Sequence, residues 1–230
     1  MKISGFQKLT LLDFPGHTAC TLFTSGCNMR CPFCHNTPLV TGTAEEDYSE
    51  EEILSYLRKR QGILDGVAIT GGEPLLHKDI GEFIRKIKDA GYKVKLDTNG
   101  SKSEVLKSLT DEGLVDFIAM DIKNTEEKYA LTSGCNIPYE EIAKSIDIIK
   151  TSGIPHEFRT TVVKEFHSTE DIISIAKMLG KSEKYYLQQF KDSGDILCEG
   201  CSAHREELLS EMAEKASEFV LLCETRGVSQ

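Results

Sequence analysis

Residues 18–34 read TACTLFTSGCNMRCPFC and join the two features that decide the fold. The first part, Thr18–Phe23, is a short run of apolar and β-branched residues that predicts a strand. The second part places Cys27, Cys31 and Cys34 within eight residues, which is the strongest local signal in the chain. A strand that runs directly into a group of possible metal ligands predicts an α/β fold whose functional loops follow its strands.

Outward from this stretch, short β-type runs alternate with helical patterns. Further strands are expected at Val67–Thr70, Lys93–Asp97, Phe117–Asp121, His156–Val162 and Tyr185–Phe190, and helices at Ser49–Arg60, Lys78–Ala90, Ser101–Asp111, Tyr139–Thr151, Thr169–Leu179 and His204–Thr225. Six βα units imply a parallel sheet with right-handed crossovers. Because six units are two short of a closed barrel, we expect a partial (β/α)6 barrel of parallel strands, with an open doubly wound sheet as the alternative. The chain reads as one domain over residues 1–230, with a core at about 17–190 and a C-terminal loop and helix at 191–230.

Composition excludes several classes of function. The formal charge of −10 argues against a nucleic-acid-binding surface, which needs clustered Lys and Arg. No apolar run reaches the length of a membrane span, and the N-terminus lacks the apolar stretch of a signal peptide, so we expect a cytoplasmic protein. In that reducing compartment, eight cysteines indicate metal binding or redox chemistry rather than disulfides.

Polar motifs follow four of the later predicted strands. They are Gly71-Gly72-Glu73-Pro74, Asp97-Thr98-Asn99-Gly100, Asp121-Ile122-Lys123 and Gln188-Gln189-Phe190. The carboxyl ends of parallel strands meet at one edge of the sheet, where sites are built, so we expect these motifs to converge with the cysteines. Arg159 lies inside a predicted buried strand, and a buried guanidinium needs a partner such as a carboxylate.

The cysteine loop, Cys27–Cys34, spaces its thiols by three and two residues. A closed [4Fe–4S] site takes four cysteines, so three would leave one iron open to react. The alternative is a structural zinc site completed by His35 or by a distant cysteine. A second pair, Cys198 and Cys201, could add a metal or redox site, although a reduced pair in a loop is the favoured interpretation.

The Cys-x3-Cys-x2-Cys spacing after a first strand resembles the signature of radical S-adenosylmethionine (SAM) enzymes. Within these, residues 26–36, GCNMRCPFCHN, look like the activating enzymes of glycyl-radical enzymes. Residues 157–163, EFRTTVV, and the Gln-Phe ending of the sixth strand resemble the activating protein of anaerobic ribonucleoside-triphosphate reductase. His17-Thr18 and Gln188-Gln189 depart from the formate-lyase type of activator, in which an Ile-Arg pair and a His are found.

The resemblance implies a radical SAM fold and an oxidoreductase that cleaves SAM reductively to a 5′-deoxyadenosyl radical. That radical would generate a glycyl radical on a partner enzyme, with a flavodoxin or ferredoxin as electron donor. The expected partner is anaerobic ribonucleoside-triphosphate reductase. The alternatives are a formate-lyase-type partner, a small metabolite as in deazapurine synthases, or a non-enzymatic zinc-binding interaction module.

The resemblance also assigns roles to residues. Cys27, Cys31 and Cys34 would hold one [4Fe–4S] cluster. SAM would be bound through its amino group by Gly72 and Glu73, through its carboxylate by Lys123, through its adenine by Phe33 and His35, and elsewhere by Asp97, Asn99, Asp121, Arg159 and Gln188. A monovalent cation is expected near Asp97 and Asp121.

Overall fold

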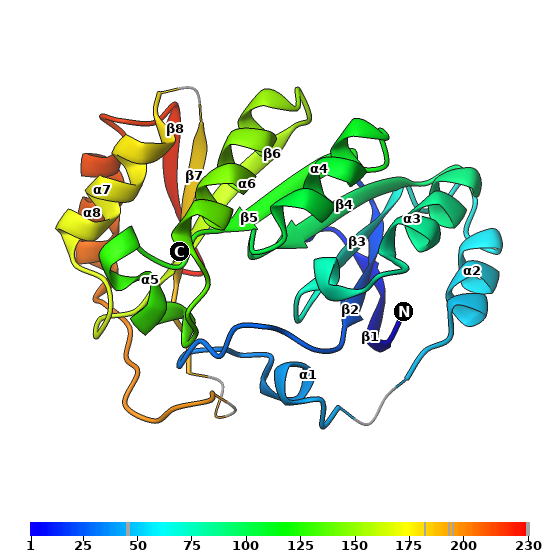
Figure 1. The fold of residues 1–230 in the computed structure, drawn as a ribbon, viewed down its shortest axis with the longest axis horizontal. Helices are drawn as coiled ribbons and strands as arrows, with labels where there is room; N and C mark the ends of the chain where they lie inside the picture. The colour runs from blue at the N-terminus through cyan, green and yellow to red at the C-terminus, as the bar shows by residue number, and fades with distance from the viewer. Residues whose placement is uncertain (45–46, 182, 193, 195, 229–230) are drawn as a thin grey trace.

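The computed structural model describes residues 1–44, 47–181, 183–192, 194 and 196–228. In these residues one open sheet carries eight strands in the order β1-β2-β3-β4-β5-β6-β7-β8 (Figure 1). The strands are β1 (Ile3–Thr10), β2 (Ala19–Thr24), β3 (Gly66–Gly71), β4 (Lys93–Thr98), β5 (Phe117–Asp121), β6 (His156–Val162), β7 (Lys184–Gln189) and β8 (Leu222–Arg226). β1 pairs antiparallel with β2, and every later neighbour pairs in parallel.

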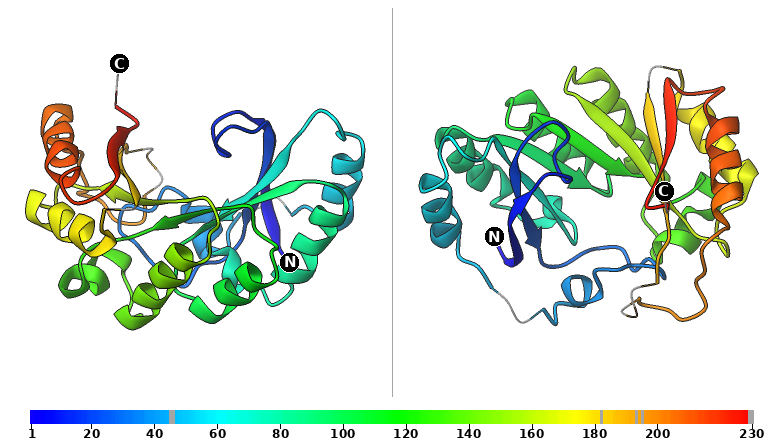
Figure 2. Two further views of the ribbon diagram at one scale, coloured as in Figure 1. Left: turned by 90° about the horizontal axis from the view of Figure 1, so that it is seen from above. Right: turned by 180° about the vertical axis from the view of Figure 1, so that it is seen from behind.

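The predicted partial barrel of parallel strands is confirmed, because the six expected strands are β2–β7 in sequential order. β1 and β8 extend this sheet as its two unjoined edges. The sheet is curved and its longer helices lie along the convex side, whereas a doubly wound sheet would carry helices on both faces (Figure 2). The concave side therefore carries none of these longer helices.

The helices are α1 (Thr37–Thr41), α2 (Glu50–Arg58), α3 (Ile80–Asp89), α4 (Ser103–Asp111), α5 (Glu126–Ser133), α6 (Tyr139–Thr151), α7 (Thr169–Leu179) and α8 (Glu206–Ala216), with a 3-10 turn η1 at Pro74–Leu76. Local chemistry explains several boundaries. Ser49 and Glu52 form a reciprocal capping box at the start of α2, and Gly91, with φ +89°, follows the end of α3. Across the residues that the structure describes, no helix has the length and apolar character needed to cross a membrane.

The C-terminal region differs from the prediction. The expected helix His204–Thr225 ends at Ala216, and Leu222–Arg226 forms strand β8 instead. The backbone N–H of Leu221 donates to the carbonyl of Glu183 at 2.9 Å, and β8 then pairs with the open edge of β7. Pairing with an existing sheet edge overrides the helical pattern of the sequence, because edge N–H and C=O groups need partners.

Three more elements were not predicted: β1, α1 and α5. α1 has only five residues, which is too short for a helical pattern to be recognised in the sequence. The polar and apolar residues of α5 do not lie on separate faces, so this helix has no amphipathic pattern either. β1 is an edge strand in which five of the eight residues are exposed or partly exposed.

Alternation along the strands gives the two faces of the sheet different chemistry. Val94 and Leu96 of β4 belong to the buried apolar core, whereas Asp97 lines a cavity on the other face. In β6, Phe158 belongs to the core while Arg159 lines that cavity. Because side chains alternate along a strand, the apolar positions face the helices and the concave face becomes polar.

Candidate active site

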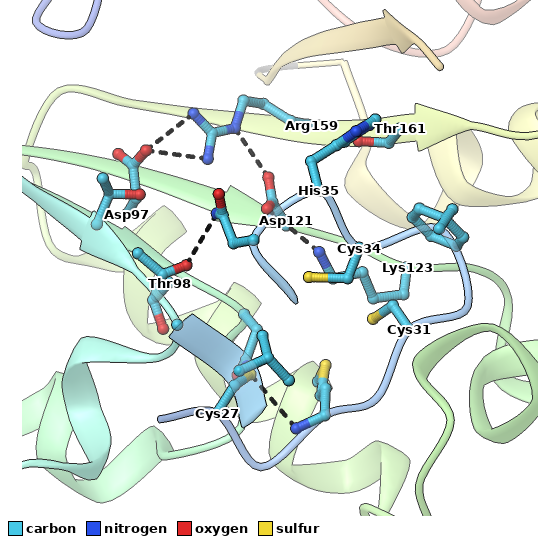
Figure 3. Close-up of a pocket in the computed structure, with 18 residues that line it drawn as sticks. Cys27, Cys31, Cys34, His35, Asp97, Thr98, Asp121, Lys123, Arg159 and Thr161 are labelled. Atoms are coloured by element: carbon cyan, nitrogen blue, oxygen red, sulfur yellow. Dashed lines mark hydrogen bonds and ion pairs between the residues drawn. The ribbon is translucent and has the colours of Figure 1, made fainter. Parts of the chain in front are cut away.

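A cavity lies at the carboxyl ends of the strands, where the polar motifs were expected to converge (Figure 3). Its lining includes most of the predicted site residues, namely Cys27, Cys31, Phe33, Cys34, His35, Gly72, Asp97, Asn99, Asp121, Lys123 and Arg159. Glu73 and Gln188 are the predicted residues that do not line it. The lining also includes Gly71 and Thr98, which belong to the predicted polar motifs, and residues to which the sequence assigned no role, namely Met29, Asn36, Val40, Thr70 and Thr161.

The cysteine loop is fixed from both sides by segments that were not predicted as helices. At its start, the N–H of Gly26 donates to the carbonyl of Leu39 in α1 at 2.7 Å. Further along, the N–H of Arg30 donates to the carbonyl of Ser133 in α5 at 2.8 Å. Gly134, which ends α5 in a left-handed conformation, lies so close that a Cβ there would stand 2.1 Å from the Arg30 carbonyl oxygen. Backbone contacts therefore set the position of the loop.

The three thiols share the cavity but are not arranged around one ion. In the described part of the chain, no three His, Cys, Asp or Glu side chains form a group that could hold a metal ion. His35, the proposed fourth zinc ligand, instead stacks on the ring of Phe190 with centroids 5.4 Å apart. Three cysteine thiols that line one cavity are a ligand set suited to an iron–sulfur cluster.

Burial and a few polar contacts together set the chemistry of the thiols. Burial raises the pKa of Cys27, and burial raises the pKa of Cys31 to about 12 although the Lys123 ammonium opposes the shift. The Cys27 Sγ accepts hydrogen bonds from the Met29 backbone N–H at 3.4 Å and from the Asn99 side-chain amide at 3.8 Å. These donors are suited to a thiolate, because hydrogen bonds to sulfur stabilise negative charge on it.

The glycine pair at the end of β3 is required by the chain that leads from β2 into the cysteine loop. A Cβ on Gly72 would lie 2.0 Å from the Gly26 carbonyl oxygen, and one on Gly71, with φ +113°, would lie 2.4 Å from the Thr24 backbone nitrogen. Glycine is needed at both positions because neighbouring backbone approaches them too closely for a Cβ. The Glu73 N–H completes the contact by donating to the Gly26 carbonyl at 2.8 Å.

The Glu73 carboxylate lies behind the cavity wall with 1% of the residue exposed. It accepts hydrogen bonds from the backbone N–H of Leu75 at 3.0 Å, the Thr98 hydroxyl at 2.8 Å and the backbone N–H of Asn99 at 2.7 Å. Burial raises its pKa to about 7 against these hydrogen bonds. Glu73 thus ties the end of β3 to the end of β4 and positions Asn99.

The sequence predicted one carboxylate partner for Arg159, and the structure shows two. Its Nε donates to Asp121 at 2.9 Å, and both terminal nitrogens donate to Asp97 at 3.2 Å (Figure 3). Burial alone would raise the pKa of Asp121, but Arg159 and Lys123 outweigh it and hold that pKa well below the usual range. The concave face thus carries a compact network of charges beside the thiols.

The remaining predicted contacts are spread along the rim. Phe33 is buried and lies 6.0 Å, centroid to centroid, from Phe166, so it belongs to the core and to the cavity wall. Gln188 stands behind Thr161, whose hydroxyl donates to its side-chain oxygen at 3.4 Å. Thr161 was within reach of sequence reasoning, because it lies two residues from Arg159 on the same strand face. Val40 could not be predicted as a lining residue, because the five residues of α1 are too few to show a helical pattern in the sequence.

The second cysteine pair lies next to the cysteine loop but outside the cavity lining. The N–H of Cys198 donates to the Pro32 carbonyl at 2.9 Å, and the neighbouring Ser202 is held by the Glu165 carboxylate. Cys198 is exposed and Cys201 is half-buried. A second cluster at this pair stays an untested alternative.

Comparison with known proteins places this geometry in context. The sequence model of the Radical SAM superfamily matches residues 21–179. A predicted glycyl-radical enzyme activating enzyme of Methanocaldococcus jannaschii is 34% identical over 230 residues, with 95% of this chain and 92% of that protein covered. The pyruvate formate-lyase-activating enzyme of Clostridium pasteurianum is 24% identical over 205 residues, covering 84% of this chain and 83% of that protein.

Solved structures share the fold at low sequence identity. A radical SAM methyltransferase from Sphaerobacter thermophilus superposes with a TM-score of 0.75 at 13% identity, covering 95% of this chain and 68% of that one. SuiB from Streptococcus suis, solved with bound S-adenosylmethionine, gives a TM-score of 0.68 at 15% identity and covers 89% of this chain and 49% of that one.

Proposed function

Because this chain belongs to the radical SAM superfamily and to its glycyl-radical enzyme activating enzymes, we propose that it activates an anaerobic ribonucleoside-triphosphate reductase. It is an enzyme whose cofactors are a [4Fe–4S] cluster and SAM. The observation that carries the proposal is the cavity itself, in which three thiols and a network of opposite charges meet at the rim of an open partial barrel.

We assign the cluster to Cys27, Cys31 and Cys34. Each thiol lines the cavity, and the loop that carries them is anchored to α1 and α5 by its backbone. When bound, the cluster supplies the electron that cleaves SAM to methionine and a 5′-deoxyadenosyl radical able to remove a hydrogen atom from the substrate. The protein's own task is to hold the ligands, keep water out and admit the substrate.

Charge guides the assignment of the SAM site. Lys123 lines the cavity near the thiols, and its ammonium suits the carboxylate of a bound amino acid moiety. The Gly72 backbone also lines the cavity and offers a carbonyl for the amino group. We assign the adenine to Phe33 and His35, because burial lowers the His35 pKa and keeps the ring neutral for stacking. With the carboxylate, the amino group and the adenine assigned, we assign the ribose to the hydrogen-bonded pair Thr161 and Gln188.

The open concave side supports a macromolecular substrate. A glycine α-hydrogen can be removed because the product radical is delocalised over both flanking amides, but that glycine must enter the cavity on a loop of the partner. The unjoined edges β1 and β8 leave the sheet open for such a loop. The segment 157–163 and Gln188-Gln189 favour the ribonucleotide reductase, and the similarity to the clostridial enzyme makes a formate-lyase-type partner the second candidate.

The proposed chemistry requires an electron donor and a reducing compartment. A flavodoxin or ferredoxin would deliver the electron, since either supplies single electrons at low potential. We place the activity in the cytoplasm, where reducing conditions keep thiols free for a cluster.

The partner is tested by mixing the reconstituted enzyme anaerobically with SAM, a reductant and the reductase from the same genome. We expect a doublet electron paramagnetic resonance signal on the reductase, with 5′-deoxyadenosine formed about one for one. A reductase with Ala in place of the radical glycine should give no doublet. Radical formation on a formate-lyase-type enzyme instead, or turnover of a small metabolite, would replace the proposed partner.

The cluster ligands are tested separately by iron and sulfide analysis. Reconstituted enzyme should hold about four irons and four sulfides per chain. Cys27→Ala, Cys31→Ala and Cys34→Ala should each abolish SAM cleavage, whereas the matched variants Cys198→Ala and Cys201→Ala should keep the SAM-binding cluster. Loss of about half of the iron in either control would reveal a second cluster.

A further inference from the structure

The two aspartates of the cavity have no carboxylate oxygen left without a cationic donor. Asp97 Oδ1 accepts from the Lys95 ammonium and its Oδ2 from the Arg159 guanidinium. Asp121 Oδ1 accepts from Arg159 at 2.9 Å and its Oδ2 from Lys123 at 3.2 Å. Three side-chain cations therefore surround two carboxylates.

Lys95 is the member of this network that sequence reasoning missed. It is 2% exposed, although it carries a charge. It lies on the same strand face as Asp97, and the sheet register places Ala68 of β3 and Phe117 of β5 beside it. An ammonium in such a setting is strongly unfavourable unless a carboxylate compensates it, so Lys95 and Asp97 stabilise each other.

This arrangement does not fit the monovalent cation that was expected near Asp97 and Asp121. Sodium and potassium ions bind where carboxylate charge is uncompensated, whereas three cationic side chains already balance the charge of the two aspartates here. We infer that Lys95 is a built-in counterion that takes the place of a monovalent cation beside the SAM site. Lys95 is a positioning residue, because it acts on the site through Asp97.

The inference rests on the proposed SAM site, and it predicts how ligand binding responds to salt. With Lys95 present, Asp97 is neutralised from within and the cavity needs no small cation. With Lys95→Met, a side chain of similar length without charge, Asp97 loses its ammonium donor, and a residue that lines the cavity gains an uncompensated negative charge that a small cation can offset. The variant should thereby acquire the cation dependence that the natural enzyme lacks.

The test measures SAM affinity by anaerobic calorimetry and thermal stability by circular dichroism on reconstituted enzyme. Sodium, potassium and choline chlorides are compared at equal ionic strength. For the natural enzyme, we expect the dissociation constant of SAM to change less than about twofold among the salts, since no ion site is filled or emptied. For Lys95→Met, we expect binding at least about tenfold weaker in choline, with a melting temperature that rises when sodium or potassium replaces choline.

Two controls separate the possible outcomes. Lys95→Arg keeps the charge and should remain independent of the cation. Lys88→Met breaks another lysine–aspartate pair, with Asp116 at 2.7 Å, outside the cavity lining, and should lower stability equally in all three salts.

Two results would overturn the inference. The first is a natural enzyme whose SAM affinity or melting temperature falls in choline. The second is a folded Lys95→Met variant whose SAM affinity and melting temperature are the same in all three salts. If Lys95→Met does not fold, the salt series on the natural enzyme decides. Absence of SAM binding in every salt would instead refute the proposed function, while the melting series would still report on Lys95.

Discussion

The side-chain amide of Asn99 donates a hydrogen bond to the Sγ of Cys27 across 3.8 Å. Asn99 stands at the end of β4 and Cys27 follows β2, so the contact joins two separate polar motifs. Its orientation is fixed, because the Asn99 backbone N–H is held by Glu73 and its side-chain oxygen accepts from the Ser101 N–H at 2.9 Å. A side chain at the end of β4 thus donates a hydrogen bond to a thiol that follows β2, and this hydrogen bond stabilises negative charge on the sulfur.

Asn99→Ala should make the cluster harder to reduce. A hydrogen bond to a ligand sulfur stabilises the more negative, reduced cluster, so its loss lowers the reduction potential by up to roughly 40 mV, the equivalent of about 1 kcal/mol. The measurement is a redox titration followed by electron paramagnetic resonance. Asn36→Ala, which removes a cavity asparagine that binds the Gly71 carbonyl, is the control and should keep the natural potential. Equal potentials in all three proteins would refute the role of Asn99.

Gly72→Ala should disturb the cysteine loop. Its new methyl group would meet the Gly26 carbonyl at 2.0 Å, and the rigid backbone on both sides must move, at a cost of about 1–3 kcal/mol. We expect most of the iron to be lost after reconstitution. In Gly81→Ala the nearest side-chain atom is 3.6 Å away, and the variant should be more stable by about 0.5–1 kcal/mol, because alanine favours the helix. Full iron content in Gly72→Ala would contradict the proposed loop contact.

Arg159→Lys should fail to replace the arginine. One ammonium cannot reach Asp121 and Asp97 with separate donors as the guanidinium does, so one of these partly buried carboxylates keeps only its lysine donor. We expect a loss of about 1.5–3 kcal/mol in the free energy of unfolding and weaker SAM binding. Arg85→Lys, which alters an exposed pair with Glu112, should cost less than about 1 kcal/mol. Urea unfolding compares them, and equal losses would contradict a special role for Arg159.

His167 should make stability fall at acidic pH. It is 2% exposed, its Nδ1 accepts from the Val163 N–H at 3.1 Å and its Nε2 donates to the Lys123 carbonyl at 2.7 Å, which requires the neutral ring. Burial lowers its pKa below the usual 6.5. The unfolded chain then binds a proton that the folded chain excludes, so its contribution is present above pH 6.5 and is lost as the pH falls, by up to about 1.4 kcal/mol per unit.

The His167 prediction is checked by urea unfolding between pH 5 and 8. Circular dichroism is the suitable probe, because the chain has no tryptophan. His167→Gln should flatten the pH dependence, while His17→Gln, in the β1–β2 loop, should retain it. An unchanged slope in His167→Gln would show that another group is responsible.

The sequence by itself determined the alternation of strands and helices and therefore the partial barrel, because hydrophobic period and chain order act locally. It also indicated the cysteine loop and most of the cavity lining, because polar residues at the ends of parallel strands must share one edge. The tertiary structure alone decided β8, α1 and α5, because a free sheet edge and backbone contacts with the cysteine loop stabilise segments that lack a period of their own. It alone decided that Glu73 faces Asn99 rather than the cavity and that Lys95 neutralises Asp97. Such pairings depend on which side chains meet after the sheet curves, and spacing along the chain does not contain that information.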